Sequence, residues 1–139
     1  MSAHASAQVS AQGGATDAAP TPAPSFRPDA PRAVRAGDEL DAAALAPWLA
    51  AHVPAFAGAT PGTLEIAQFG DGFSNLTYLL RHGDAECVLR RPPRGGASGN
   101  AHDVLREHRL LTALRPTYPR VPRPLAACDD ASVLGAPFY

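Results

Sequence analysis

The 139-residue chain carries 12 Lys and Arg residues against 13 Asp and Glu residues, which gives a formal net charge of −1. This balance provides no general attraction to nucleic acid or to a membrane surface. Every basic residue is an arginine, so chemistry that needs a lysine amine is excluded. The two cysteines, Cys87 and Cys128, are too few for a disulfide scaffold or a four-cysteine zinc site, and they favour a reduced, cytoplasmic protein.

Composition divides the chain near residue 36. Residues 1–36 are rich in Ala, Pro, Ser, Gln and Gly, and they offer little apolar surface to offset the entropy of ordering. We therefore expect residues 1–36 to form a disordered tail and residues 37–139 to form the folded domain. Neither a signal-peptide core nor an apolar run of the roughly 20 residues that span a membrane is present.

The folded part begins with a predicted helix. Over residues 39–52, apolar side chains recur at helical spacing, and Asp38 is placed to cap the first turn. Pro47 lies inside this stretch and predicts a kink.

Three short strands are predicted next, because β-branched and apolar residues gather between turn residues. Their ranges are 63–69, 75–82 and 85–91. The dipeptide Gly83-Asp84 supplies hairpin-turn chemistry between the second strand and the third.

A second helix is predicted from a cap at Asn100 to about Arg115, with Ala101, Val104, His108 and Leu111 on its apolar face. Glu107 falls at the edge of this face, where a carboxylate needs a partner. Two further strands are predicted over residues 122–128 and 133–139. The element order therefore indicates an α+β fold, with an antiparallel five-stranded sheet and two helices.

Two features of this arrangement point to phosphate binding. The turn Gly70 to Asn75, "GDGFSN", can place backbone amides, a hydroxyl and a side-chain amide around phosphate oxygens, although a plain hairpin turn fits it as well. Arg90 on the third strand and Glu107 on the second helix match the cation and carboxylate with which a kinase amino-terminal lobe holds nucleotide phosphates. A structural salt bridge between helix and sheet is the alternative for this pair.

Residues 39–139 resemble the amino-terminal lobe of the aminoglycoside phosphotransferase-like (APH/choline kinase-type) small-molecule kinases. The resemblance is strongest to the branch related to the kinase-like domain of acyl-CoA dehydrogenase fusions. The matching segments are "LDAAALAPWLAAHVPAFAG", "FGDGFSNLTYLL", "ECVLRRPPRG", "SGNAHDVLREHRLL" and "RVPRPLAACDDASVLGAPFY". The resemblance implies a protein-kinase-like fold in which the second helix is the C-type helix. It also implies transfer of the γ-phosphoryl group of ATP, or of another nucleoside triphosphate, to a small-molecule hydroxyl with Mg²⁺.

The resemblance also implies roles for particular residues. Gly70, Gly72, Ser74 and Asn75 would form the phosphate-covering turn. Arg90 would stand where kinases usually place lysine, and its planar fork can bind both Glu107 and a phosphate oxygen. Asp71 departs from the glycine that is usual at its position, and an acid there is unfavourable beside phosphates.

The family's catalytic loop contains His-Gly-Asp with an Asn five residues after the Asp. His82, Gly83 and Asp84 repeat the tripeptide, but Leu89 stands at the fifth position, so the motif is expected to close a hairpin. No catalytic residue and no metal ligand is assigned in this chain. We expect a lobe that ends before the hinge, binds ATP weakly or not at all, and is inactive without a carboxy-terminal lobe or a partner chain. The alternative is a non-catalytic remnant or an interaction module with a kinase-like fold.

The sequence favours neither a metal site nor a nucleic-acid site. His82, His102 and His108 fall on a turn, a helix start and a helix face, which is a poor set of metal ligands. Residues 81–123 carry many arginines, yet no aromatic stacking series lies among them, so nucleic acid is not expected as a partner.

Overall fold

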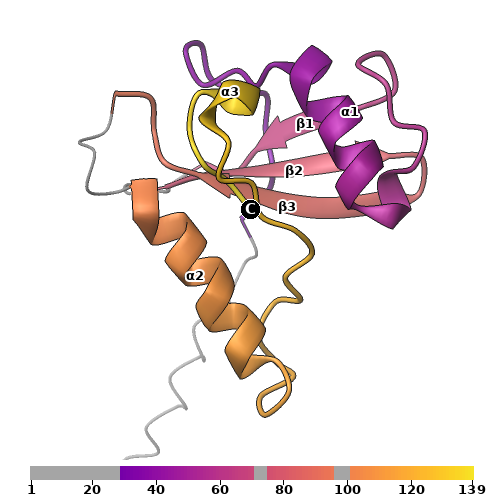
Figure 1. Ribbon diagram of the computed structural model, residues 1–139. Helices are drawn as coiled ribbons and strands as arrows, with labels where there is room; N and C mark the ends of the chain where they lie inside the picture. The colour runs from indigo at the N-terminus through magenta and orange to yellow at the C-terminus, as the bar shows by residue number, and fades with distance from the viewer. Residues whose placement is uncertain (1–28, 71–74, 96–100) are drawn as a thin grey trace, which may run out of the picture.

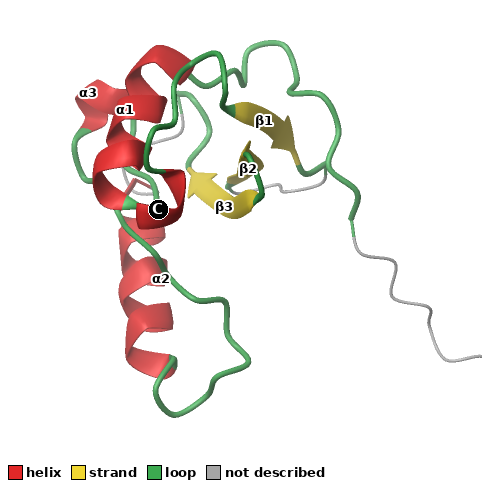
Figure 2. Ribbon diagram, turned by 90° about the vertical axis from the view of Figure 1, so that its right-hand side faces the viewer, coloured by secondary structure: helices red, strands yellow, loops and turns green. Residues whose placement is uncertain are grey.

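The computed structural model describes residues 29–70, 75–95 and 101–139, with side chains from Val104 onward in the last range. In chain order the elements are α1 (Ala42–His52), the 3-10 helix η1 (Pro54–Phe56), β1 (Glu65–Gln68), β2 (Leu76–His82), β3 (Ala85–Arg91), α2 (Ala101–Leu114) and α3 (Ala131–Leu134). Figure 1 shows α1 lying against the sheet, and both Figure 1 and Figure 2 show α2 extending away from the body of the fold. No helix in the described part of the chain is long and apolar enough to cross a membrane.

The sheet is antiparallel, with the order β1-β2-β3. Its central strand pairs on both sides, so that Leu79 lies opposite Ala67 in β1 and Val88 in β3. The hairpin between β2 and β3 closes after the pair His82–Ala85, and Gly83 takes the left-handed conformation (φ 57°) that glycine adopts without steric cost. The predicted hairpin is confirmed, and the His-Gly-Asp tripeptide lies in it.

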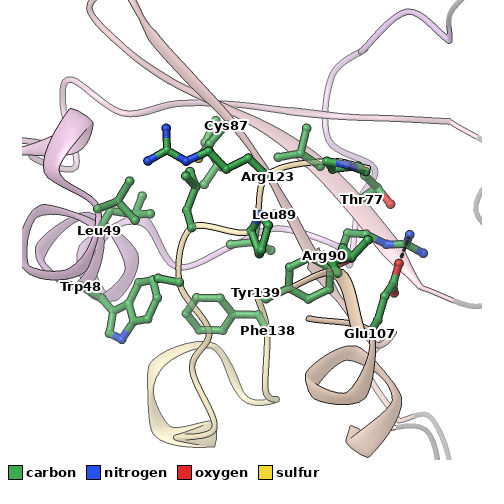
Figure 3. Close-up of a pocket in the computed structure, with 18 residues that line it drawn as sticks. Trp48, Leu49, Thr77, Cys87, Leu89, Arg90, Glu107, Arg123, Phe138 and Tyr139 are labelled. Carbon is green, nitrogen blue, oxygen red and sulfur yellow. Dashed lines mark hydrogen bonds and ion pairs between the residues drawn. The ribbon is translucent and has the colours of Figure 1, made fainter. Parts of the chain in front are cut away.

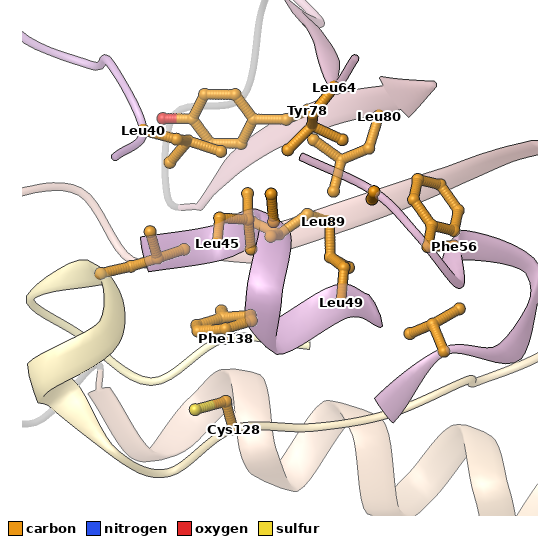
Figure 4. Packing of buried hydrophobic residues seen from close by; sticks show 14 of the residues in the cluster. Leu40, Leu45, Leu49, Phe56, Leu64, Tyr78, Leu80, Leu89, Cys128 and Phe138 are labelled. Carbon is orange, nitrogen blue, oxygen red and sulfur yellow. The ribbon is translucent and has the colours of Figure 1, made fainter. Parts of the chain in front are cut away.

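One face of the sheet forms the core together with α1 (Figure 4). Tyr78, Leu80 and Leu89 project from β2 and β3 onto this face and are nearly fully buried, as are Leu45 and Leu49 of α1. The period of two along a strand sends the alternate residues to the opposite face. That opposite face carries the candidate site described below.

The first helix begins later than the sequence predicts. Asp41, rather than Asp38, is the cap, and its carboxylate accepts hydrogen bonds from the amides of Ala43 (2.9 Å) and Ala44 (3.2 Å). Leu40 precedes the cap and, like Leu45 at the fourth helical position, belongs to the core, which is the arrangement of a hydrophobic staple. By residue type, Asp38 and Asp41 could each cap the helix. The burial of Leu40 explains why Asp41 is the cap.

Residues 29–36 fall within the predicted tail, but the structure pairs this segment with the sheet. Arg32 and Gln68 exchange both backbone hydrogen bonds, at 2.9 and 2.8 Å. The buried Gln68 side chain then accepts from the Arg35 amide and donates to Asp38, each at 2.9 Å. A single polar side chain at the end of β1 thus holds the segment, and composition carries no sign of this long-range contact. Residues 1–28 lie outside the described part of the chain.

The last eighteen residues also differ from the prediction. In place of two strands, residues 122–139 contain the short helix α3 and one isolated bridge, Cys128–Phe138, so the described sheet has three strands rather than five. Asp130, expected in a turn, caps α3 by accepting from the Ser132 amide at 2.8 Å. Prolines at positions 122 and 124 lack the amide that a paired strand donates, which explains why the first of these segments stays irregular.

Candidate functional site

The candidate site is built on an ion pair between the sheet and the second helix. Arg90 of β3 donates from Nη1 to Glu107 Oε1 of α2 at 2.8 Å. Both side chains are about one-third exposed, at 33% and 32%. The pair that the sequence proposes is therefore formed, and it lies at a surface that a ligand can reach.

The remaining donors of the Arg90 guanidinium define what the site can do. Glu107 engages Nη1, and Nε is buried without a hydrogen-bond partner in the described part of the chain. An arginine has five N–H donors in a fixed fork, so a second acceptor can be held while Glu107 orients the first. This arrangement suits recognition of an anion with several oxygens.

Tyr139 closes one side of the ion pair. Its backbone is fixed to Arg90, with Arg90 N–H donating to Tyr139 O at 2.7 Å and Tyr139 N–H donating to Arg90 O at 3.1 Å. Burial and then the neighbouring Glu107 carboxylate raise the pKa of the Tyr139 phenol to about 12. The phenol thus stays protonated at neutral pH, and it adds no negative charge beside the arginine.

Of the four turn residues proposed from the sequence, Gly72 and Ser74 lie outside the described residues. Gly70 and Asn75 flank that gap. The Gly70 amide donates to Asp29 Oδ2 at 3.0 Å, and a Cβ at Gly70 would meet the guanidinium of Arg32. The Arg32 side chain therefore packs closely over Gly70 and would have to shift to admit a larger residue. Composition assigns Asp29 and Arg32 to the tail, so the sequence does not predict their contacts with Gly70.

A pocket of about 470 Å³ runs beside the ion pair, along the free edge of β3 (Figure 3). Leu49 of α1 and Val53, which follows this helix, line one side, and the irregular residues 122–126 line another. Cys87 also lines the pocket, and burial raises the pKa of its thiol to about 11, so the thiol is a poor nucleophile at neutral pH. Sequence patterns give no sign of this pocket, because its walls come from distant segments.

No group of three or more His, Cys, Asp or Glu residues within the described ranges could hold a metal ion. The described residues thus offer no ligand set for the Mg²⁺ that the resemblance implies. His82 lies in the hairpin near Phe56, whereas His108 of α2 lies near the ring of Tyr139.

Comparison with known proteins agrees with this geometry. Residues 65–139, more than half of the chain, match the model of the family described as "Phosphotransferase enzyme family". Acyl-CoA dehydrogenase family member 11 of Gallus gallus is 38% identical over 76% of this chain, and family member 10 of Mus musculus is 42% identical over 56% of it. This chain covers 14% and 7% of the lengths of those two relatives.

A solved structure gives the same result. A Ralstonia eutropha protein assigned as an aminoglycoside phosphotransferase is 35% identical and superposes with a TM-score of 0.58 over 73% of this chain and 27% of its own. The predicted resemblance to aminoglycoside phosphotransferase-like kinases, and to their branch among the acyl-CoA dehydrogenase fusions, is confirmed. The chain belongs to the phosphotransferase enzyme family.

Proposed function

We propose that this chain forms the nucleotide-binding, amino-terminal lobe of an ATP-dependent phosphotransferase whose acceptor is a small-molecule hydroxyl. The observation that carries the proposal is the ion pair of Arg90 and Glu107 at 2.8 Å, whose side chains are about one-third exposed. Glu107 orients the guanidinium, and the rest of the fork would bind the oxygens of the nucleotide phosphates. Gly70, Gly72, Ser74 and Asn75 would cover the same phosphates from the turn between β1 and β2.

Backbone bonds at the end of the chain support the larger sheet that this lobe requires. Tyr139 pairs with Arg90 of β3, and Phe138 in turn pairs with Cys128. These bonds continue the antiparallel order beyond β3 in the two positions where a fourth and a fifth strand would lie. In this arrangement α2 serves as the C-type helix, because its Glu107 contacts the β3 arginine.

We infer that these 139 residues bind Mg·ATP weakly and do not turn it over. They supply an orienting cation and a turn, but no catalytic base is assigned among them. A phosphoryl transfer needs an in-line acceptor and a base in fixed positions. Affinity is therefore expected in the millimolar range, which corresponds to about 4 kcal/mol of binding free energy.

Isothermal titration calorimetry tests the proposal with Mg·ATP as the ligand and the full chain as the host. Arg90→Ala is expected to weaken Mg·ATP binding about tenfold, while weak binding of adenosine, which has no phosphate, is unchanged. Arg81→Ala is the matched control, because Arg81 also pairs with a glutamate (Glu86) but lies toward the far end of the hairpin. Equal binding of Mg·ATP by the parent and Arg90→Ala chains would instead support a non-catalytic interaction module.

A further inference from the structure

Arg91, the last residue of β3, is a buried cation that forms no ion pair with any described residue. Its side chain is 1% exposed, and the ion pairs of the described chain involve other arginines. One of its nitrogens, Nη1, donates to the carbonyl of Leu134 at 3.0 Å. A buried charge without a counter-charge lowers the stability of a fold, so an anion beside this guanidinium would be favourable.

The other nitrogens of Arg91 define the shape of an anion that would fit. Nε and Nη2 are buried, and neither has a hydrogen-bond partner in the described part of the chain. These two atoms form one edge of the planar guanidinium, from which two N–H bonds point in the same direction. A carboxylate matches this edge with its two oxygens, in the bidentate geometry that makes arginine ion pairs strong.

A second pocket, of about 630 Å³, adjoins Arg91. It lies at the end of β3, between residues 92–95 and residues 131–137, which include α3. Because Arg91 lines this pocket and is almost fully buried, it lies at the closed, inner side. The second pocket shares no lining residue with the pocket beside Arg90. It is therefore separate from the candidate nucleotide site.

The remaining walls of the second pocket favour an anion with an apolar body. Arg94 adds a second positive charge to the lining, and its Nη2 donates to the carbonyl of Glu39 at 2.8 Å. The one acid in the lining, Asp41, directs its Oδ1 to the first amides of α1 as the helix cap. Apolar surface comes from four residues, which are Pro92, Pro93, Val133 and Pro137.

We propose that the second pocket binds a small monocarboxylate with an apolar body, whose two oxygens accept hydrogen bonds from Nε and Nη2 of Arg91. Arg94 attracts the anion, and the apolar body packs against the prolines. Little water reaches the guanidinium, which strengthens the charged hydrogen bonds. Both nitrogens are covered by protein atoms, so the lining must shift slightly to admit the carboxylate. This cost limits the expected dissociation constant to about the millimolar range.

The probe is benzoate, and benzamide is its uncharged control of nearly the same shape. Nuclear magnetic resonance of the arginine Nε–H groups in the full chain reports on Arg91, whose signal is assigned by its loss in Arg91→Met. We expect a saturable downfield shift of this signal with benzoate and binding about tenfold weaker with benzamide. No shift with benzoate up to its solubility limit, or equal binding of the two compounds, would overturn the proposal.

Inorganic phosphate tests whether the apolar body matters. It offers oxygens to the same edge of Arg91 but has no surface to pack against the prolines. Phosphate should therefore bind about tenfold more weakly than benzoate, as measured by the shift of the Arg91 Nε–H signal. Equal binding of phosphate would contradict the assignment to a carboxylate with an apolar body.

Substitutions separate the geometry of Arg91 from its charge. Arg91→Lys keeps a positive charge but loses the edge with two nitrogens, so calorimetry should show benzoate binding about tenfold weaker while circular dichroism shows an intact fold. Arg94→Ala, at an exposed position, should weaken benzoate binding about threefold. Arg81→Ala is the matched control and should have no effect. Unchanged binding in both Arg91→Lys and Arg94→Ala would contradict the proposal.

Arg90→Ala tests whether benzoate binds at the other arginine of the pair. Because the two pockets share no lining residue, this variant should bind benzoate as the parent chain does. The result does not depend on whether the chain binds Mg·ATP. Loss of benzoate binding in Arg90→Ala would place the carboxylate at the ion pair with Glu107 and overturn the proposal.

Discussion

Arg90 and Arg91 are neighbours on β3, yet the sheet gives them opposite environments. Arg90 is about one-third exposed and is paired with Glu107 across the space between sheet and helix. Arg91 is 1% exposed and donates from Nη1 to the carbonyl of Leu134 at 3.0 Å. The difference follows from the period of two along a strand, which sends one side chain to the face that carries the ion pair and the next to the core face.

The two environments imply two different roles. Burial lowers the pKa of Arg91, and its Nε and Nη2 have no partner in the described part of the chain. Removing a cation of this kind from water lowers the stability of the folded state. The hydrogen bond from Arg91 to Leu134 joins β3 to α3. Arg90 is about one-third exposed instead, and it pairs with Glu107. We therefore expect substitutions at Arg91 to change mainly stability and substitutions at Arg90 to change mainly binding.

The largest expected effect is that of Arg91→Ala. The substitution removes a large, fully buried side chain and leaves the Leu134 carbonyl without its donor. Cavity formation and an unsatisfied buried carbonyl together should lower the free energy of unfolding by about 3 kcal/mol. Urea denaturation followed by circular dichroism measures this change.

Arg91→Met is the control for this prediction. Methionine fills most of the space and removes the buried charge, so the loss of stability should be clearly smaller than for alanine. If methionine and alanine are equally destabilising, the hydrogen bond to Leu134 rather than side-chain volume determines the effect. If neither variant loses stability, Arg91 does not hold α3 against β3, and the contrast with Arg90 disappears.

The ion pair of Arg90 and Glu107 should contribute less to stability than its neighbour. A pair that is one-third exposed typically contributes between 0 and about 1 kcal/mol. A double-mutant cycle with Arg90→Ala and Glu107→Ala, measured by urea denaturation at low salt, should give a coupling energy in this range. A coupling above about 2 kcal/mol would make the pair a structural salt bridge, the alternative weighed from the sequence.

The structure also indicates which features the sequence could predict. The β2–β3 hairpin and the pairing of Arg90 with Glu107 depend on local signals: a Gly-Asp turn, alternating strands, and a helix carboxylate at the edge of an apolar face. The attachment of residues 29–36 depends instead on distant packing, because the Gln68 side chain of β1 holds this segment to the sheet. Such contacts between distant segments leave no periodic pattern in the sequence.

The stability of the fold should also depend on alkaline pH through Tyr139, which lies beside the ion pair of Arg90 and Glu107. Its folded pKa of about 12 lies above the ordinary value of 10, so the folded state holds the proton more tightly than the unfolded state. The corresponding stability is fully present below pH 10 and is lost as the pH rises toward 12. Tyr139→Phe should remove this part of the decline, which thermal melts at pH 9, 10 and 11 can follow. An unchanged pH profile in the variant would show that folding does not raise the pKa of the Tyr139 phenol.

The smallest expected effect is at Arg81 and Glu86, a second strand arginine with a glutamate partner. These side chains are 44% and 54% exposed, and they pair across the hairpin on the same face of the sheet as Arg90. Water screens the interaction, so Arg81→Ala should change the free energy of unfolding by less than about 0.5 kcal/mol. It should also leave Mg·ATP binding unchanged. The two pairs lie on the same face and have the same chemistry. A loss of nucleotide binding in Arg81→Ala would therefore show that the positive charge of this face determines binding. In that case the geometry that Glu107 imposes on Arg90 would not be the cause.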